Sequence, residues 1–171
     1  MDITAFYKVS YGLYIVTSAS DGRMAGQIAN TVFQVTSEPI QIAACLNKEN
    51  DTHKAVKESG AFGVTILELE TPMEFIGRFG FRKSSEFDKF DWVEYRIGKT
   101  GVPLVTEHAV AVIEAKVVME CDVGTHTLFI GEVVDAEVVK DAEVLTYADY
   151  HLIKKGETPR TATVYFESNE S

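Results

Sequence analysis

The sequence predicts a mostly antiparallel β-barrel that carries a few short helices. Six or more segments are rich in β-branched and aromatic residues, and most of them are joined by short polar turns, which is typical of all-β barrels. A parallel doubly wound fold would need long helices between the strands, and the sequence contains no such helical pattern. Closing the sheet into a barrel would also remove the edges that apolar strands otherwise expose.

Length, composition and charge fit one globular domain over residues 1–171. The chain has 46% hydrophobic residues and a net charge of −10, from 16 basic and 26 acidic side chains. A chain of this length buries a sizeable core without disulfides or a structural metal. The acidic balance argues against nucleic acid or a membrane surface as partner, so an anionic ligand must be bound by local donors. Because we recognise no signal peptide and no membrane span of roughly 18 apolar residues, we expect a cytoplasmic protein.

Three strands are predicted in the N-terminal part, at residues 11–17, 28–36 and 40–46. The turns between them are residues 20–22 (Ser-Asp-Gly) and 37–39 (Ser-Glu-Pro), which contain residue types that favour turns. The third strand is a short apolar run of the fully buried kind.

A short helix is predicted at residues 53–59, followed by a strand at residues 61–67. Gly60 suits the position just past the helix end, where left-handed backbone is common. The candidates for the N-cap are Asn50, Asp51 and Thr52.

A second helix is predicted to begin after Thr71. Thr71 would be the N-cap, Pro72 the first helical residue, and Glu74 would complete a capping box. Gly77 and Gly80 would end this helix early.

The C-terminal half is predicted to begin with a charged and aromatic segment at residues 82–90 that forms either a loop or a broken helix. Alternating apolar and polar residues predict a long strand at 110–123, which a Gly-Thr-His turn connects to a second strand at 127–139. These two strands would form a hairpin. Residues 162–166 are predicted to be a last strand, and residues 167–171 a frayed tail.

A polar segment joins the strand at residues 40–46 to the following helix. It supplies amides at Asn47 and Asn50, a positive charge at Lys48 and a hydroxyl at Thr52. The first N–H groups of a helix lack partners and its dipole favours anions, so the segment is a candidate cradle for a phosphate. Spacing alone favours an ordinary capped surface loop, and both interpretations stay open here.

Amide and hydroxyl side chains also interrupt the predicted second strand at its start. Gln27, Asn30 and Thr31, which flank Ala29, lie either at a barrel rim facing a polar ligand or in a row facing solvent. The carbonyls and ring nitrogens of an isoalloxazine ring would satisfy such groups.

The histidines show no metal-ligand spacing, and no CxxC pair is present to hold zinc or an iron–sulfur cluster. We therefore expect no metal. His126 follows a glycine and a threonine, so it is either an exposed proton donor or a hydrogen-bonded turn histidine. The four histidines are His53, His108, His126 and His151.

Buried positions are expected for the two cysteines, Cys45 and Cys121, which lie in apolar stretches and are expected to remain unpaired. A cluster of aromatic residues between positions 75 and 92 would serve either the core or an interface between subunits, and the core is favoured. The cluster comprises Phe75, Phe79, Phe81, Phe87, Phe90 and Trp92.

Seven short segments occur in a fixed order: 11–18 (YGLYIVTS), 26–31 (GQIANT), 37–39 (SEP), 47–53 (NKENDTH), 58–62 (ESGAF), 127–133 (TLFIGEV) and 150–151 (YH). With them, residues 6–165 resemble the flavin reductase-like, FMN-binding split-barrel family. Within that family the sequence is most similar to the flavin reductase module of high-molecular-weight rubredoxins and to stand-alone relatives of the flavoredoxin and ferric reductase type.

The resemblance implies a homodimer of split barrels with one FMN per subunit near the interface. His126 matches the family histidine on the nicotinamide side of the flavin, and is the candidate catalytic residue. Lys83 is a candidate second phosphate partner. The resemblance assigns the cofactor-binding positions to Gln27, Ala29, Asn30, Thr31, Asn47, Lys48, Asn50, Thr52, His53 and Lys83.

The resemblance further implies an FMN-dependent oxidoreductase that accepts hydride from NAD(P)H and passes electrons to an acceptor. A rubredoxin-like protein, free flavin or a ferric chelate could be that acceptor. The alternative is a flavoredoxin-like electron carrier, fed by redox proteins and with little NAD(P)H activity. A non-catalytic binding barrel is a third interpretation. Oxidation of pyridoxamine phosphate is disfavoured because a basic C-terminal motif is absent.

Overall fold

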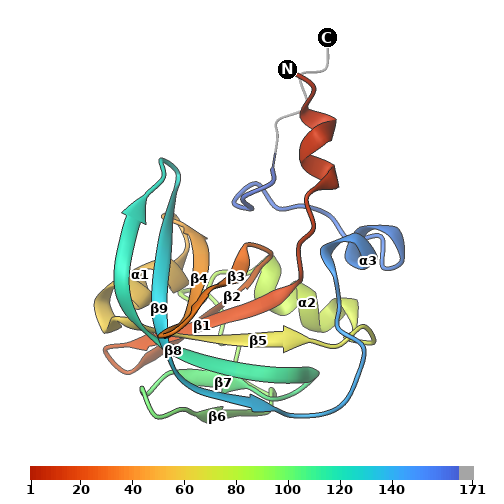
Figure 1. Ribbon diagram of the computed structural model, residues 1–171. Coiled ribbons are helices and arrows are strands. Elements are labelled where there is room, and N and C mark those ends of the chain that lie inside the picture. Colours follow the sequence, from red (N-terminus) through yellow and green to blue (C-terminus); the bar gives the residue numbers. More distant parts are fainter. Residues whose placement is uncertain (166–171) are drawn as a thin grey trace.

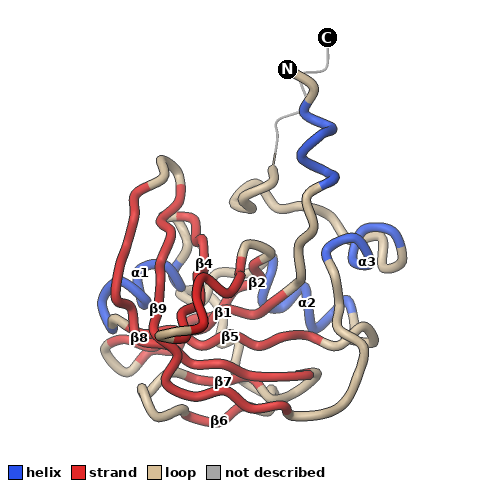
Figure 2. The backbone as a smooth tube through the Cα atoms, in the orientation of Figure 1, coloured by secondary structure: helices blue, strands red, loops and turns tan. Residues whose placement is uncertain are grey.

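The computed structural model describes residues 1–165, in which strands outnumber helices (Figure 2). The strands are β1 (Tyr14–Ser20), β2 (Arg23–Ala29), β3 (Val32–Ser37), β4 (Ile40–Asn47), β5 (Ala61–Leu67), β6 (Tyr95–Ile97), β7 (Pro103–Val105), β8 (Ala109–Asp122) and β9 (His126–Val138). The helices are the 3-10 helix η1 (Ile3–Lys8) and the α-helices α1 (Asp51–Ser59), α2 (Met73–Gly80) and α3 (Tyr147–Leu152).

The main sheet has seven antiparallel strands in the order β2-β1-β5-β8-β9-β4-β3, and β6 and β7 form a separate pair. The first and last strands of this order, β2 and β3, follow one another in the chain. Only Asn30 and Thr31 separate them, so the two edges of the sheet are drawn together (Figure 1). The backbone N–H of Cys45 donates to the carbonyl of Thr31 at 3.0 Å and fixes this crossing. The predicted antiparallel barrel is confirmed.

Apolar side chains fill both faces of the central strands. On β1, Val16 lies in the barrel interior with Phe62 and Phe129. Its neighbour Ile15 points to the opposite face, into a second cluster that contains Phe79 of α2. Successive residues of a strand face opposite sides, so β1 stabilises the barrel and holds α2 against its outside.

The hairpin of β8 and β9 is longer than the barrel. The first half of β8 is largely buried, whereas its last residues are exposed, and the tip projects beyond the body in Figure 1. Helix η1 also stands away from the barrel and buries none of its residues. Both features leave apolar side chains exposed, among them Val118, Met119 and Phe6.

The predicted strand at 28–36 was wrong, because the chain breaks pairing at Asn30 and Thr31 to pass from one sheet edge to the other. The strand predicted at 61–67 and the hairpin of β8 and β9 are confirmed. Residues 162–165 of the predicted last strand form turns instead, while residue 166 and the tail at 167–171 lie outside the described residues.

The predicted capping box of the second helix was also wrong. Pro72 is the N-cap of α2, and no side chain caps this helix. The Thr71 hydroxyl donates to the carbonyl of Glu68 at 2.6 Å and stabilises the preceding turn instead. Gly77 lies within the helix, which ends at Gly80. The first helix has Asn50 as its N-cap and Gly60 in left-handed backbone at φ 68°, as the sequence predicts.

Three of the clustered aromatics, Phe75, Phe79 and Phe90, are buried in the core, whereas Phe81 and Trp92 are exposed. Cys121 is exposed, contrary to expectation, because it lies in the projecting half of β8.

Within residues 1–165, no helix has the length and apolar character to cross a membrane. In the same residues no cluster of side chains suited to a metal ion is found.

Candidate functional site

A pocket lies where β2 and β4 end and α1 begins. Its other walls are the loop after α2, which is residues 81–89, and residues 157–163 near the C-terminal end, here called the cover segment. The cavity volume is about 80 Å³. Pockets for larger ligands hold roughly 300–1,000 Å³, and here the cover segment lies against part of the wall.

Strand pairing places two of the predicted residues opposite one another. Asn47, the last residue of β4, is the register partner of His126, the first residue of β9. Both line the pocket. The ladder between β4 and β9 therefore brings together residues that are far apart in the sequence.

The N-terminal end of α1 forms the second wall, through Asn50, Asp51 and Thr52. Its N-cap, Asn50, makes no side-chain cap hydrogen bond. An uncapped helix start presents backbone N–H groups and the positive end of the helix dipole, both of which favour an anion. The Asp51 carboxylate accepts from the backbone N–H of Ser85 at 2.9 Å, which ties the 81–89 loop to this helix end.

The pKa of Asp51 is lowered overall. Burial alone would raise it, but the hydrogen bonds from Ser85 and the charges of Lys54 and Lys83 outweigh that effect. The carboxylate is therefore ionised at neutral pH and holds the loop in place.

Two buried amide atoms at the pocket have no hydrogen-bond partner among the described residues, 1–165. They are Oε1 of Gln27, an acceptor, and Nδ2 of Asn30, a donor. Leaving such groups unsatisfied costs about 1–3 kcal/mol each, so a ligand with complementary polar edges would be favoured there. The isoalloxazine ring of FMN has both carbonyl acceptors and a ring N–H donor, and FMN fits this donor and acceptor set.

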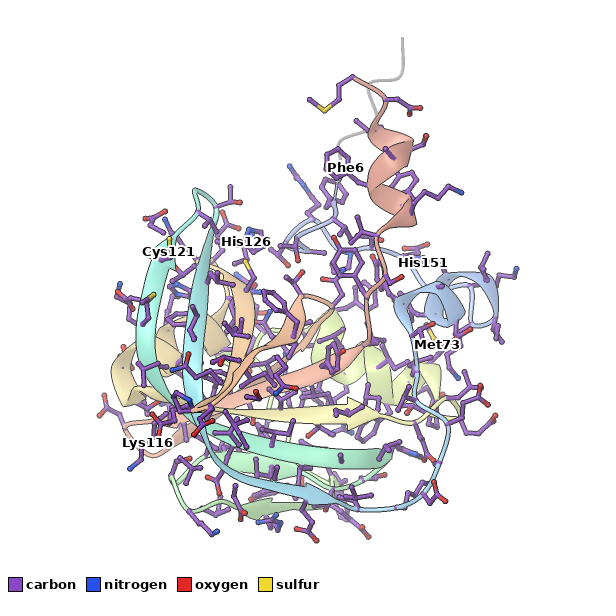
Figure 3. The ribbon with its side chains drawn as sticks, viewed as in Figure 1. Phe6, Met73, Lys116, Cys121, His126 and His151 are labelled. Carbon is purple, nitrogen blue, oxygen red and sulfur yellow. The ribbon has the colours of Figure 1, made fainter. Side chains whose placement is uncertain are left out.

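His126 is buried, with 8% of its surface exposed, so it is the hydrogen-bonded turn histidine and not the exposed one. Its Nε2 donates to the carbonyl of Thr161 at 3.2 Å, and its Nδ1 accepts from the hydroxyl of Thr125 at 2.8 Å. Burial lowers its pKa, against the smaller opposite effect of the Thr161 carbonyl. The ring is therefore neutral at pH 7, and Figure 3 shows it on the side of the hairpin that faces the C-terminal segment.

The 81–89 loop brings cations to the pocket, among them Lys83, which the sequence predicted, and Arg82. It also brings Lys89, which the sequence analysis missed. Lys89 is 3% exposed, and its Nζ donates to the carbonyls of Gly26 at 2.7 Å and Phe79 at 3.0 Å. Burial lowers its pKa to about 8, and the charge of Asp51 opposes part of that shift. Its position directly before a buried phenylalanine was the only local signal.

Three predicted residues lie outside the pocket lining. Lys48 pairs with Asp122 of the hairpin at 2.7 Å, and both side chains are partly exposed. The Nε2 of His53 lies 2.8 Å from the hydroxyl of Thr127. Thr31 borders the pocket by donating to Oδ1 of Asn30 at 3.2 Å.

The structure thus brings eight of the predicted residues into one pocket. Cys45, Ser84, Tyr147 and Tyr150 line it as well and were missed, because their spacing carries no local signature. The predicted residues in the pocket are Gln27, Ala29, Asn30, Asn47, Asn50, Thr52, Lys83 and His126.

The fold and pocket define a class: an antiparallel β-barrel whose rim offers polar edges to a planar ring and an anion site at a helix start. Comparison with known proteins gives the family. The chain belongs to the family described as flavin reductase like domain, which matches residues 6–154.

Relatives and solved structures agree with this membership. The chain is 85% identical over 168 residues to a ferric-chelate reductase (NAD(P)H) of Archaeoglobus fulgidus, with 98% of this chain and 99% of the relative covered. It is 42% identical to a high molecular weight rubredoxin of Moorella thermoacetica, covering 99% of this chain and 74% of the relative. The NADH:FAD oxidoreductase SgcE6 of Streptomyces globisporus superposes with a TM-score of 0.76 at 26% identity, over 83% of this chain and 84% of that one.

Proposed function

We propose that the chain is an NAD(P)H-dependent flavin reductase that holds FMN in the pocket and passes its electrons to a ferric chelate. The observation that carries the proposal is the pair of unpartnered buried amide atoms of Gln27 and Asn30 beside the uncapped start of α1. This arrangement offers polar edges to a ring at one end and an anion site at the other. The relative at 85% identity, named as a ferric-chelate reductase (NAD(P)H), supports the choice of donor and acceptor.

When bound, FMN would supply the redox chemistry, which is acceptance of hydride from a nicotinamide and transfer of one or two electrons to an acceptor. The protein supplies position and electrostatics. Gln27 and Asn30 hold the ring edge, with Ala29, Asn47 and the neighbouring Thr31 beside them.

The remaining side chains of the proposed site bind the rest of the flavin and its partner. Asn50, Thr52 and Lys83 bind the phosphate end. Neutral His126 would be able to donate a hydrogen bond from Nε2 to the bound flavin once the Thr161 carbonyl is displaced. Lys48 and His53 lie outside the pocket lining and hold the polar segment and the start of α1 in place. Lys48 does so through Asp122, and His53 through Thr127.

The test is the visible absorption spectrum of the purified protein loaded with FMN, recorded without oxygen. Bleaching of the flavin bands by NADH or NADPH, and their return on adding a ferric chelate, would support the proposal. Bands that persist with both nicotinamides but bleach with a reduced ferredoxin would instead favour a flavoredoxin-like carrier that exchanges electrons with a rubredoxin-like protein. A protein that cannot be loaded with FMN would contradict both.

We also infer that the active form is a cytoplasmic homodimer. Exposed apolar side chains gather on the projecting hairpin and on β3, and patches of this kind mark protein interfaces. They include Met119 and Phe33. Sedimentation should give twice the 18.9 kDa mass of the chain. Met119→Glu should shift the protein toward the monomer, and a wild-type monomer at micromolar concentration would contradict the inference.

A further inference from the structure

Lys89 has an environment unlike that of every other cation in residues 1–165. It alone among their lysines and arginines is buried. Its Nζ donates to two backbone carbonyls, Gly26 on β2 and Phe79 in α2, and it forms no salt bridge within residues 1–165. An ammonium group has three donors, so one N–H is left without a carboxylate to receive it in the described part of the chain.

Burial without a paired anion is unfavourable for a lysine. The pKa of Lys89 falls to about 8, with burial as the cause, so the group is still mostly protonated at neutral pH. Asp51 supports the charge from α1, but its carboxylate is bonded to Ser85. A buried cation that is only partly compensated favours an anionic ligand in the same pocket.

The surroundings of Lys89 indicate which part of a flavin would bind next to its positive charge. The pocket around it contains the start of α1 and the loop cations Arg82 and Lys83. The loop is anchored at its middle, through Ser85 to Asp51 of α1, and at its last residue, through Lys89 to β2 and α2. This is the phosphate end of the proposed site.

We propose that Lys89 is the positioning residue of this phosphate end: its two carbonyl bonds hold the 81–89 loop in place, and its buried charge makes the pocket prefer FMN to flavins without a phosphate. The inference rests on the proposed function and assigns it a specificity determinant. Riboflavin carries the same ring as FMN without the phosphate, so it separates the two contributions.

The experiment compares the dissociation constants of FMN and riboflavin for the wild type, Lys89→Met, Lys89→Arg and Lys116→Met. Loss of one charge-assisted contact should reduce the preference for FMN over riboflavin about 10- to 100-fold in Lys89→Met. Lys89→Arg should keep most of the preference. Lys116→Met removes the same charge from an exposed position of β8, which lies well away from the pocket residue His126 in Figure 3, and should change nothing. An equal loss for both flavins, or none, would overturn the proposal.

A second measurement needs no variant and decides the question even if Lys89→Met fails to fold. Lys89 loses its proton as pH rises past about 8, so the wild-type preference for FMN should be full at pH 7 and decline toward pH 9. The groups that face Lys89 are Asp51 from α1, which is already ionised, and the exposed loop cations Arg82 and Lys83. A preference that stays constant between pH 7 and 9 would overturn the role of Lys89. A wild type that binds neither flavin would instead overturn the proposed function.

Discussion

The two walls of the pocket are built in different ways. The barrel wall comes from β2, β4 and β9, where ladder hydrogen bonds set the position of each residue, as in the pairing of Asn47 with His126. The cover segment has no regular secondary structure and contacts the barrel through a few groups. The carbonyl of Thr161 accepts from His126, and the hydroxyl of Thr163 donates to Asn30 at 3.0 Å.

This difference indicates which wall recognises the ligand and which one moves. A site on strands keeps its geometry because the whole sheet would have to change with it. A segment held by a few hydrogen bonds opens at low cost, since each contributes only about 0.5–1.5 kcal/mol. The cover segment also accepts from Nε2 of His126, the donor that the proposed site would turn toward FMN, so cover and cofactor compete for this N–H.

The largest expected effect is on the barrel wall. Phe129→Ala removes a fully buried ring from β9 that packs on His53, at 5.3 Å between ring centroids. Large-to-small core changes of this kind cost about 3–5 kcal/mol. Urea unfolding at a fixed protein concentration measures the loss. Trp92→Ala is the matched control, because Trp92 is 89% exposed and its removal should change stability by less than about 0.5 kcal/mol. Similar losses of unfolding free energy in the two variants would contradict the prediction that the buried ring of Phe129 stabilises the barrel wall.

Removal of the cover segment beyond Thr158 should act on binding and leave the barrel stable. A chain ended after Thr158 keeps the hydrogen bond between Tyr147 and Thr158 but loses the contacts to Asn30 and His126. FMN should associate about tenfold faster in stopped-flow fluorescence, because two to three hydrogen bonds no longer have to break first. Thr163→Val, which removes only the side-chain bonds, should give an intermediate rate. Slower association together with weaker binding would show that the cover segment is part of the binding site.

More of the barrel wall than of the cover segment could be predicted from the sequence. The strand at 61–67 is a continuous apolar run, so its limits could be read locally, and Asn47 and Asn50 follow from the start of a helix. The closeness of Asn47 and His126 could not be predicted locally, because it depends on the register between β4 and β9. Lys89 was missed because its one local signal, a phenylalanine directly after it, does not by itself show that the loop turns inward. Asn30 and Thr31 were noticed as polar residues but placed inside a strand that they in fact end.

A smaller effect is expected from Gln27→Met, which tests whether the barrel wall is built for a ligand. The variant replaces a buried amide oxygen that has no partner. Its unfolding free energy should stay the same or rise by up to about 1 kcal/mol, because an unsatisfied polar group is lost. FMN affinity should fall about five- to tenfold, the equivalent of one hydrogen bond. Parallel urea unfolding and fluorescence titration measure both, and a variant that loses stability but keeps its affinity would show that Gln27 is purely structural.

The smallest expected effect is a pH dependence of stability that the cover segment itself modulates. Burial lowers the pKa of both His126 and His53 in the folded protein, whereas unfolded histidines titrate near pH 6.5. Below that pH the unfolded chain therefore binds more protons than the folded protein. The contribution of these histidines to the free energy of unfolding is greatest above about pH 6.5 and falls as the pH is lowered further. Urea unfolding between pH 7.5 and 5.5 should show this slope, and His126→Asn should reduce it.

In the chain ended after Thr158, His126 gains access to water, its pKa moves back toward the ordinary value, and the slope should fall as well. An unchanged slope in the shortened chain would mean that the barrel wall alone keeps His126 buried, and that the cover segment does not shield it.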